Sequence, residues 1–309
     1  MRASGLDSES SSQEAYSRGR KKTYKPRHQT PWLIVISQLG DVTYRLSKSV
    51  DVYDADGKSV GKVQLPRFFE TPVRHDLIRR AVVALQSHLF QPQGRDPMAG
   101  KRTTAKSIGV GHGMARVPRV KGERFARSNL AAFAPMTVKG RLTFPPVPTK
   151  HVAKKINRKE LKLAMLSAVA ATSSKALIKA RGHRVPDDRE YPLVVSDDLE
   201  RITKNSDAER VLRNLGVWED VERASTKKNR AGKGSVRGRP SRHGVSALVV
   251  VEKKQGAEKA FRNFAGVKVV DVASMSVYDL APGTYAGRLT IWTQSALKGL
   301  DGRFGGRPS

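Results

Sequence analysis

Arginine and lysine side chains spaced among glycine and proline are the chemically distinctive feature of this sequence. Residues 94–159 contain 16 Lys and Arg, two acidic residues, seven Gly and six Pro. Guanidinium groups donate paired hydrogen bonds to phosphate, and glycine lets a backbone approach a polyanion closely. Phe125, Phe133 and Phe144 add rings for stacking on unpaired bases, although Phe133 could equally fill a small apolar contact within this stretch. These residue types indicate nucleic-acid binding over a long stretch.

A second stretch has the same character. Residues 223–244 carry eight Lys and Arg, four Gly and no acidic residue. Such a composition is typical of a segment that contacts a polyanion.

Two glycine motifs resemble nucleotide-binding loops only superficially. Gly109–Gly113 is neither preceded by an apolar strand nor followed by an amphipathic helix, and Gly232–Ser235 lacks the spacing of a phosphate loop. Both nucleotide-binding signatures need a strand before the loop and a helix after it, because the helix N-terminus binds the anion. We therefore expect no nucleotide-binding loop at either motif and interpret Gly232–Ser235 as a flexible basic loop.

Catalytic and metal-binding constellations are not visible in the sequence. The seven histidines are dispersed and there is no cysteine, so neither a zinc cluster nor a thiol nucleophile is indicated. The carboxylate pairs Asp187–Asp188 and Asp197–Asp198 are adjacent in sequence, which on a strand sends the two side chains to opposite faces. We interpret them as solvated acids at turns and helix starts, and we expect no catalytic residue, no metal, no cofactor and no small-molecule substrate.

Charge identifies the class of partner. The chain has 58 Lys and Arg against 28 Asp and Glu, a formal charge of +30 on 309 residues. No run of about 18 apolar residues and no signal-peptide pattern accompanies this charge. The combination favours nucleic acid over a membrane and predicts a soluble protein that is not exported.

The apolar pattern predicts the elements that must hold these segments. A hairpin is expected over 50–65 and a helix over 73–90, with Thr71 and Pro72 at its start. Asn157 and Glu160 resemble a capping box that opens one long helix up to Gly182. Beyond it, strands (192–195, 247–251, 267–272, 288–292) alternate with helices (207–215, 218–223, 256–263, 293–300). Such alternation predicts an α/β fold with a mostly parallel sheet flanked by helices, into which a long basic loop is inserted.

The same pattern divides the chain into regions. We expect a basic, largely disordered extension over 1–48, whose cluster from Arg18 to Arg27 would contact RNA or a neighbouring protein. The predicted regions are one α/β domain (49–93 and 150–300), an extended RNA-binding loop (94–149), a second basic insertion (223–244) and a flexible tail (301–309).

Several short sequence motifs, in the same order along the chain, resemble the ribosomal protein L4 family in its archaeal and eukaryotic form. The resemblance covers about residues 50–300 and is most specific in the central motifs and in 230–239. The motifs are Phe69–Ala81, Asp96–Thr103, Gly113–Gly122, Val138–Arg141, Pro145–Pro146, Val194–Asp198, Arg230–Arg239, Leu280–Gly283 and Gly287–Trp292.

The resemblance implies a structural protein of the large ribosomal subunit in the cytoplasm, not an enzyme. Its partners would be large-subunit ribosomal RNA, neighbouring ribosomal proteins and the nascent polypeptide, because the loop tip in this family helps to line the exit tunnel. Met114, Arg116 and Arg119 match the tunnel-lining tip. Together with the composition, the resemblance assigns RNA binding to Arg95, Lys101, Arg102, Lys106, His112, Arg116, Arg119, Lys121, Arg124, Arg127, Lys139, Arg141, Arg230, Lys233, Arg237, Arg239 and Arg242.

The chain departs from the family pattern at two places. Gly111-His112-Gly113 stands where Gly-Arg-Gly is common, and Thr143-Phe144-Pro145-Pro146 stands where Ala-His-Pro-Pro is usual. The alternatives from other classes are a non-ribosomal RNA chaperone and an RNA-processing factor. Stoichiometric co-sedimentation with the large subunit in high salt would separate a ribosomal component from either.

The number of cationic residues predicts a steep salt dependence of RNA binding. If about eight phosphates are neutralised, the logarithm of the affinity should fall with the logarithm of salt concentration at a slope of roughly −6 to −7. Filter binding of the full chain to structured RNA at several salt concentrations measures this slope. A slope near −1 would contradict the prediction.

Overall fold

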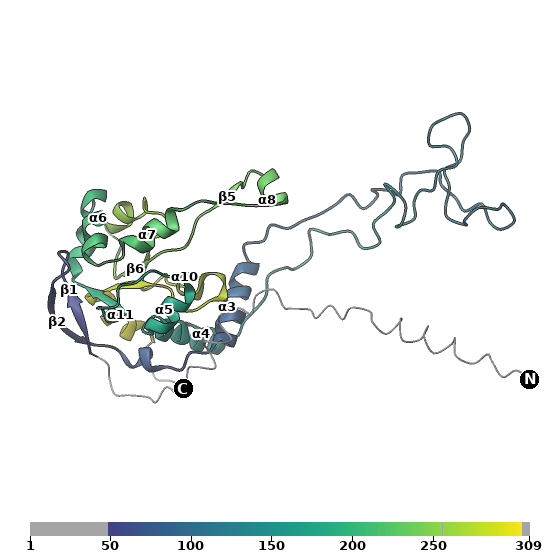
Figure 1. Cartoon of the computed structure of the whole chain (residues 1–309). Helices are drawn as coiled ribbons and strands as arrows, with labels where there is room; N and C mark the ends of the chain where they lie inside the picture. Colours follow the sequence, from purple (N-terminus) through teal and green to yellow (C-terminus); the bar gives the residue numbers. More distant parts are fainter. Residues whose placement is uncertain (1–48, 255, 305–309) are drawn as a thin grey trace, which may run out of the picture. The chain divides into compact units, whose positions relative to one another are not determined.

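A six-stranded sheet organises the protein in the computed structural model, which describes residues 49–254 and 256–304. The sheet order is β2-β1-β3-β8-β6-β7, in which only the β1–β2 hairpin is antiparallel (Figure 1). The strands are β1 (Ser49–Tyr53), β2 (Ser59–Gln64), β3 (Leu193–Val195), β6 (Leu248–Val251), β7 (Lys268–Asp271) and β8 (Thr290–Thr293). The predicted α/β class and mostly parallel sheet are confirmed, whereas the predictions for 1–48 and 305–309 lie outside the described residues.

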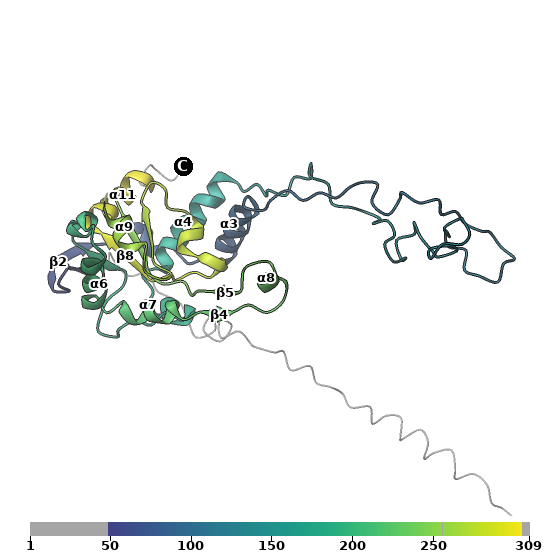
Figure 2. The same ribbon diagram turned by 90° about the horizontal axis from the view of Figure 1, so that it is seen from above.

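Helices cover both faces of this sheet, as the buried strand residues require. In β3, Val194 belongs to one apolar core while Leu193 and Val195 belong to the other. Because successive side chains of a strand point to opposite faces, a strand buried on both sides must be apolar throughout. One core packs under α3 (His75–Ser87), α4 (Arg158–Ala171), α10 (Val277–Leu280) and α11 (Gln294–Phe304), and the other under α6 (Asn205–Asn214), α7 (Trp218–Ser225) and α9 (Ala257–Phe261) (Figure 2).

The long helix expected up to Gly182 is in fact two helices. α4 ends at Ala171, and α5 (Lys175–Arg181) follows at an angle of 93°. The hydroxyls of Thr172 and Ser173 donate to the carbonyls of Val169 and Ala170, and such local bonds compete with continuation of a helix. The break lets Leu177 and Ile178 of α5 reach the two different cores.

The predicted helix starts were also wrong in detail. Asn157 is the N-cap of α4, but its side chain makes no capping hydrogen bond. Glu160, the expected partner of the box, instead forms an ion pair with Arg80 of α3 at 2.9 Å. Thr71 caps the end of a short 3-10 helix (Arg67–Glu70), and α3 begins at His75.

The last helix extends further than the glycines near residue 300 suggested. α11 continues through Phe304, so the flexible tail predicted from 301 does not begin there. Leu300 and Phe304 are buried, and the ring of Phe304 meets that of Phe68 edge-on at 5.9 Å between centroids. Burial of these side chains stabilises the last turns of the helix against the flexibility of Gly299.

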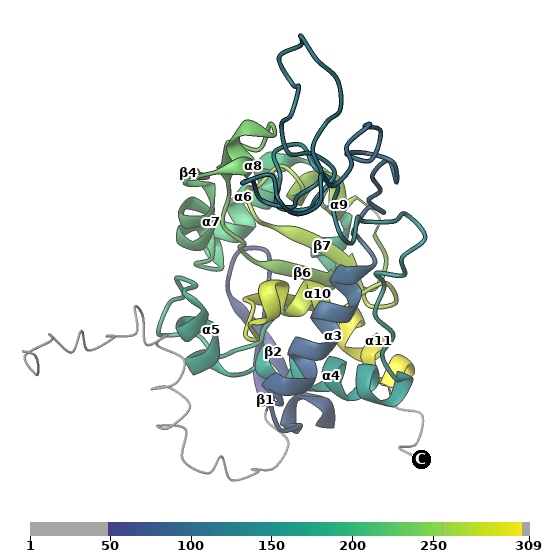
Figure 3. The same cartoon turned by 90° about the vertical axis from the view of Figure 1, so that its right-hand side faces the viewer.

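Residues 88–157, which we call the α3–α4 segment, contain no helix and no strand. The helices that flank it pack against each other (Figure 3). The backbone N–H of Lys154 donates to the hydroxyl of Ser87 at 2.8 Å, and that of Arg74 donates to the hydroxyl of Ser167 at 2.5 Å. The two ends of the segment are therefore held together by the domain.

In the part of the chain that the structure describes, no single helix is long and apolar enough to cross a membrane. The α4–α5 pair meets the criteria of length and composition only when its two bent halves are joined.

The separation of residues 110–124 from both cores predicts how the domain tolerates change. Deleting 110–124 should leave the unfolding free energy within about 0.5 kcal/mol of the intact protein, since neither core includes these residues. Ile78 of α3 is fully buried, so Ile78→Ala should lower the unfolding free energy by about 2 to 5 kcal/mol. Urea titrations of the three proteins compare these values, and a deletion that melted the domain would refute the separation.

Candidate nucleic-acid interface

The backbone hydrogen bonds within the α3–α4 segment include two isolated β-bridges. Arg119 is the centre of this pairing, because its backbone forms antiparallel bridges with both Lys106 and Ala131. Its guanidinium Nη1 also donates to the carbonyl of Asn129 at 3.0 Å. The side chain is half-buried, and its Nε is buried without a hydrogen-bond partner. Arg119 therefore holds the segment together, in addition to any contact with a ligand.

Most of the side chains assigned to RNA binding are exposed. Lys101, Arg119 and Arg141 are the half-buried exceptions. Arg141 covers the ring of Phe133 at 5.7 Å from its centroid, so this ring packs within the segment. Arg102 is exposed but pairs with Asp96. The exposed residues are Arg95, Arg102, Lys106, His112, Arg116, Lys121, Arg124, Arg127, Lys139, Arg230, Lys233, Arg237, Arg239 and Arg242.

The expected loop tip lies around three glycines in open surroundings. Gly109, Gly111 and Gly113 have positive φ angles of 83°, 85° and 62°, and a Cβ built on any of them would meet nothing within 4 Å. A positive φ is a conformation that glycine adopts without strain. Met114 next to them is 44% exposed and Arg116 is exposed.

The second basic stretch forms a small hairpin that sequence reasoning missed. β4 (Lys228–Asn229) pairs with β5 (Ser241–Arg242), and the short helix α8 (Lys233–Val236) lies between them. The backbone N–H of Arg230 donates to the carbonyl of Pro240 at 2.7 Å. Too few residues alternate here to signal a strand. The cations of residues 227–242 are thus presented on a hairpin.

Arg223, at the start of the predicted insertion, belongs to α7 and to a buried polar cluster. The carboxylate of Asp220 is fully buried and accepts hydrogen bonds from Arg223 Nε, the Arg184 backbone N–H and the Ser246 hydroxyl, at 2.9, 2.9 and 2.8 Å. His183 Nδ1 lies 2.9 Å from the same carboxylate. These partners come from distant parts of the sequence, which is why no local pattern revealed the cluster.

The electrostatics of the cluster follow from its burial. Burial alone would raise the pKa of Asp220, but the hydrogen bonds from His183 and Arg223 outweigh it and hold that pKa well below its usual value. Burial lowers the pKa of His183, so its imidazole is neutral at pH 7. We therefore assign the Nδ1–H of the neutral imidazole as a donor to the Asp220 carboxylate, and Arg223 as the positively charged partner.

A buried arginine joins the strands near this cluster. Burial lowers the pKa of Arg288 to about 10, which keeps the side chain charged at pH 7. Its guanidinium donates to the carbonyls of Ser246, Asp279 and Gly266 at 2.9, 2.8 and 3.1 Å. These contacts join the residues that precede β6 and β7 to α10.

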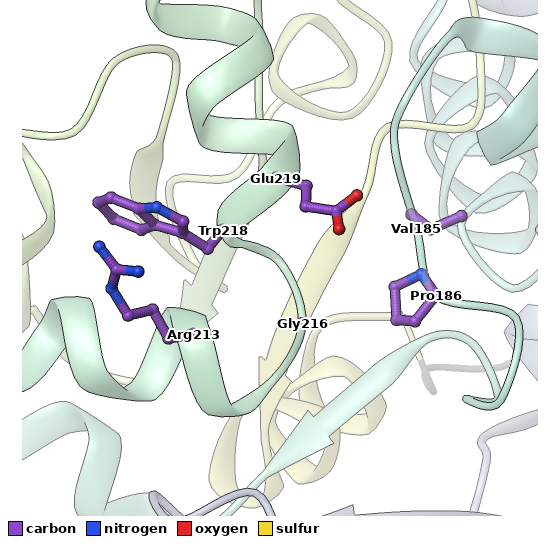
Figure 4. Close-up of a pocket in the computed structure, with 6 residues that line it drawn as sticks. All are labelled: Val185, Pro186, Arg213, Gly216, Trp218 and Glu219. Carbon is purple, nitrogen blue, oxygen red and sulfur yellow. The ribbon is translucent and has the colours of Figure 1, made fainter.

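A surface cavity of about 310 Å³ does not have the character of an active site. Figure 4 shows its lining, in which Arg213 and Glu219 are the charged residues. Arg213 lies over the ring of Trp218 at 4.3 Å from the centroid and pairs with Glu209 at 2.8 Å, so its charge is already engaged. Across the described residues, no three His, Cys, Asp or Glu side chains are grouped to hold a metal ion.

The carboxylate pairs have structural partners. Asp187 forms ion pairs with Lys175 and Lys179 of α5. Asp197 opens a 3-10 helix (Asp197–Arg201), and its side chain accepts a hydrogen bond from the backbone N–H of Ser295 at 2.8 Å. Both arrangements agree with the interpretation of these acids as turn and helix-start residues.

Fold and surface together define a class: an α/β domain that carries two cation-rich stretches poor in acidic residues. The model of the ribosomal protein L4/L1 family matches residues 63–303. The large ribosomal subunit proteins uL4 of Saccharolobus islandicus (strain L.S.2.15 / Lassen #1) and Saccharolobus solfataricus (strain P2) are each 47% identical over 264 residues, which is 85% of this chain and 97% of the relative. The chain belongs to the ribosomal protein L4/L1 family.

The Asp220 cluster predicts a pH-dependent contribution to stability. Because the folded-state pKa is lowered, the contribution is complete above the unfolded pKa of about 4 and is lost as pH falls towards the folded-state value. Asp220→Asn should reduce the unfolding free energy by about 3 kcal/mol at pH 7 and by less at pH 3. Denaturant titrations at the two pH values measure the difference.

Asp187→Asn is the matched control, because this carboxylate is exposed. It should have little effect at either pH. An Asp220→Asn variant as stable as the unmodified protein at pH 7 would contradict the role assigned to the cluster.

Proposed function

We propose that this chain is a structural constituent of the large ribosomal subunit that binds large-subunit ribosomal RNA and has no catalytic activity. The single observation that carries the proposal is the α3–α4 segment: many exposed cations on a backbone without helix or strand, anchored at both ends by a folded domain. The uL4 relatives, which match 85% of the chain, are named as large ribosomal subunit proteins.

Charge accounts for how such a segment would bind. Between 94 and 149 the acidic residues are Asp96, which pairs with Arg102, and the exposed Glu123. The exposed arginines other than Arg102 therefore lack internal counterions, and on binding they would displace the cations condensed on the RNA phosphates. Bound RNA would offset the conformational entropy lost on ordering the tip of the segment, about 1 to 2 kcal/mol per residue for the backbone.

The tip of the segment is proposed to line the polypeptide exit tunnel. Met114 and Arg116 are exposed beside glycines whose Cβ positions are open, which suits a wall that a nascent chain passes. Arg119 is assigned two roles, in the structure of the segment and in lining the tunnel, because its backbone bridges and its hydrogen bond to Asn129 already position it within the segment.

The β4–β5 hairpin gives the RNA a second place to bind. Arg230, Lys233, Arg237, Arg239 and Arg242 are exposed on it or at its tip. The base of the hairpin is tied to the domain, because the backbone N–H of Gly244 donates to the carbonyl of Ala224 at 3.1 Å. A protein that contacts RNA through two anchored segments can bring separate RNA elements together, which supports a role in early assembly; neighbouring ribosomal proteins would be its other partners.

Proteolysis and sedimentation test the proposal. In the free protein, trypsin should cut first at the exposed Arg116, Lys121 and Arg124, more slowly at Arg119, and should spare α3 and α4. Inside assembled subunits the same sites should be protected, and the protein should sediment with large subunits in stoichiometric amount at high salt. Release at high salt would favour a transient RNA chaperone, and cleavage that persists in the subunit would overturn the proposal.

A further inference from the structure

The base of the α3–α4 segment contains an aromatic cleft that the cationic residues do not explain. Phe90 and Phe144 line it from the two arms of the segment, and they are 62% and 89% exposed. The cleft has a volume of about 500 Å³, within the range of about 300 to 1,000 Å³ that holds small-molecule-sized groups. Covering large apolar rings with a partner lowers the free energy, so the cleft is suited to an occupant.

The walls of the cleft are fixed without any occupant. The backbone N–H of Arg95 donates to the carbonyl of Pro146 at 3.2 Å and joins the two arms. A Cβ built on Gly94 would lie 3.1 Å from Cδ of Pro148, so glycine permits this approach. Lys150 is held by its own backbone N–H, which donates to the carbonyl of Val147 at 3.2 Å. A site that is already shaped loses less conformational freedom on binding.

The polar groups around the cleft indicate what would fill it. Gln91, Gln93 and Lys150 contribute to the lining, which includes no carboxylate. An amide side chain both donates and accepts hydrogen bonds, as the edge of a nucleobase does, and an ammonium group binds phosphate. In the described part of the chain, neither Phe90 nor Phe144 belongs to an aromatic ring pair, so both rings are available for stacking.

We propose that this cleft, which we call the Phe90–Phe144 cleft, binds an unpaired RNA base. The base stacks on Phe144 and Phe90, a glutamine amide meets its edge, and Lys150 meets its phosphate. The assignment rests on the proposed RNA-binding function and deepens it, because it places recognition of a single-stranded nucleotide at the segment's base, apart from the phosphate contacts of its cations.

Affinity measurements separate stacking from general apolar contact. Phe144→Ala in the full chain should weaken binding to purified large-subunit ribosomal RNA by about 5- to 150-fold, the range for loss of one aromatic–base stack. Phe144→Leu, which stays apolar without a ring, should weaken it nearly as much, whereas Phe144→Trp should keep the affinity. The salt slope should be the same for all four proteins, since no cation is removed.

Leu89→Ala is the matched control. Leu89 is 75% exposed at the end of α3 and does not line the cleft, so its truncation should leave the affinity unchanged. A thermal melt of each variant checks that the domain is intact. If the unmodified chain binds RNA with the expected salt slope but Phe144→Ala binds equally well, the cleft assignment fails while RNA binding stands; if the unmodified chain does not bind RNA, the proposed function itself fails.

Ultraviolet cross-linking identifies the occupant directly. Irradiation of assembled subunits, followed by mass spectrometry, should attach a nucleotide to a peptide that contains Phe144 or Phe90, and the base should be unpaired in chemical probing of the RNA. Attachment of these peptides to another protein, or Phe144→Leu with full affinity, would show that a neighbouring apolar side chain fills the cleft and would overturn the proposal.

Discussion

The contact between α3 and α4 is the constraint on which the rest of the structure depends. It holds the two ends of a segment that has no core of its own, through packed helix faces and through the serine hydroxyls of Ser87 and Ser167. Once the ends of a loop are fixed, the entropic cost of further length grows only logarithmically. The domain can therefore present the cation-rich α3–α4 segment without spending its own stability on ordering it.

Charge is handled in two different ways in this chain. Within the domain, two buried carboxylates have charged partners: Asp220 with Arg223 at 2.9 Å, and Asp279 with Lys268 at 2.5 Å. Arg288 meets backbone carbonyls instead. In the α3–α4 segment only Arg102 is paired with a carboxylate among the ion pairs of the described residues. Like charges repel and favour an open arrangement, so the unpaired set is directed outward.

The sequence predicted what depends on local periodicity. The strand at Leu248–Val251 and the helix at His75–Ser87 could be read from apolar spacing, and the exposure of most assigned cations from their composition. The α4–α5 break, the cluster around Asp220 and the Phe90–Phe144 cleft could not. The α4–α5 break is accompanied by hydrogen bonds from two hydroxyls. The cluster and the cleft each join residues that are far apart in the chain, such as His183 and Ser246 in the cluster.

The strand order also determines when the fold can close. Val52 of β1 pairs with Val194 of β3, about 140 positions later, and β3 pairs in turn with β8, at Thr290–Thr293. During synthesis from the N-terminus, the cationic residues of the α3–α4 segment are therefore made before the sheet has its central strand. The segment therefore exists for an interval without a completed domain, and the length of that interval is a property of the topology.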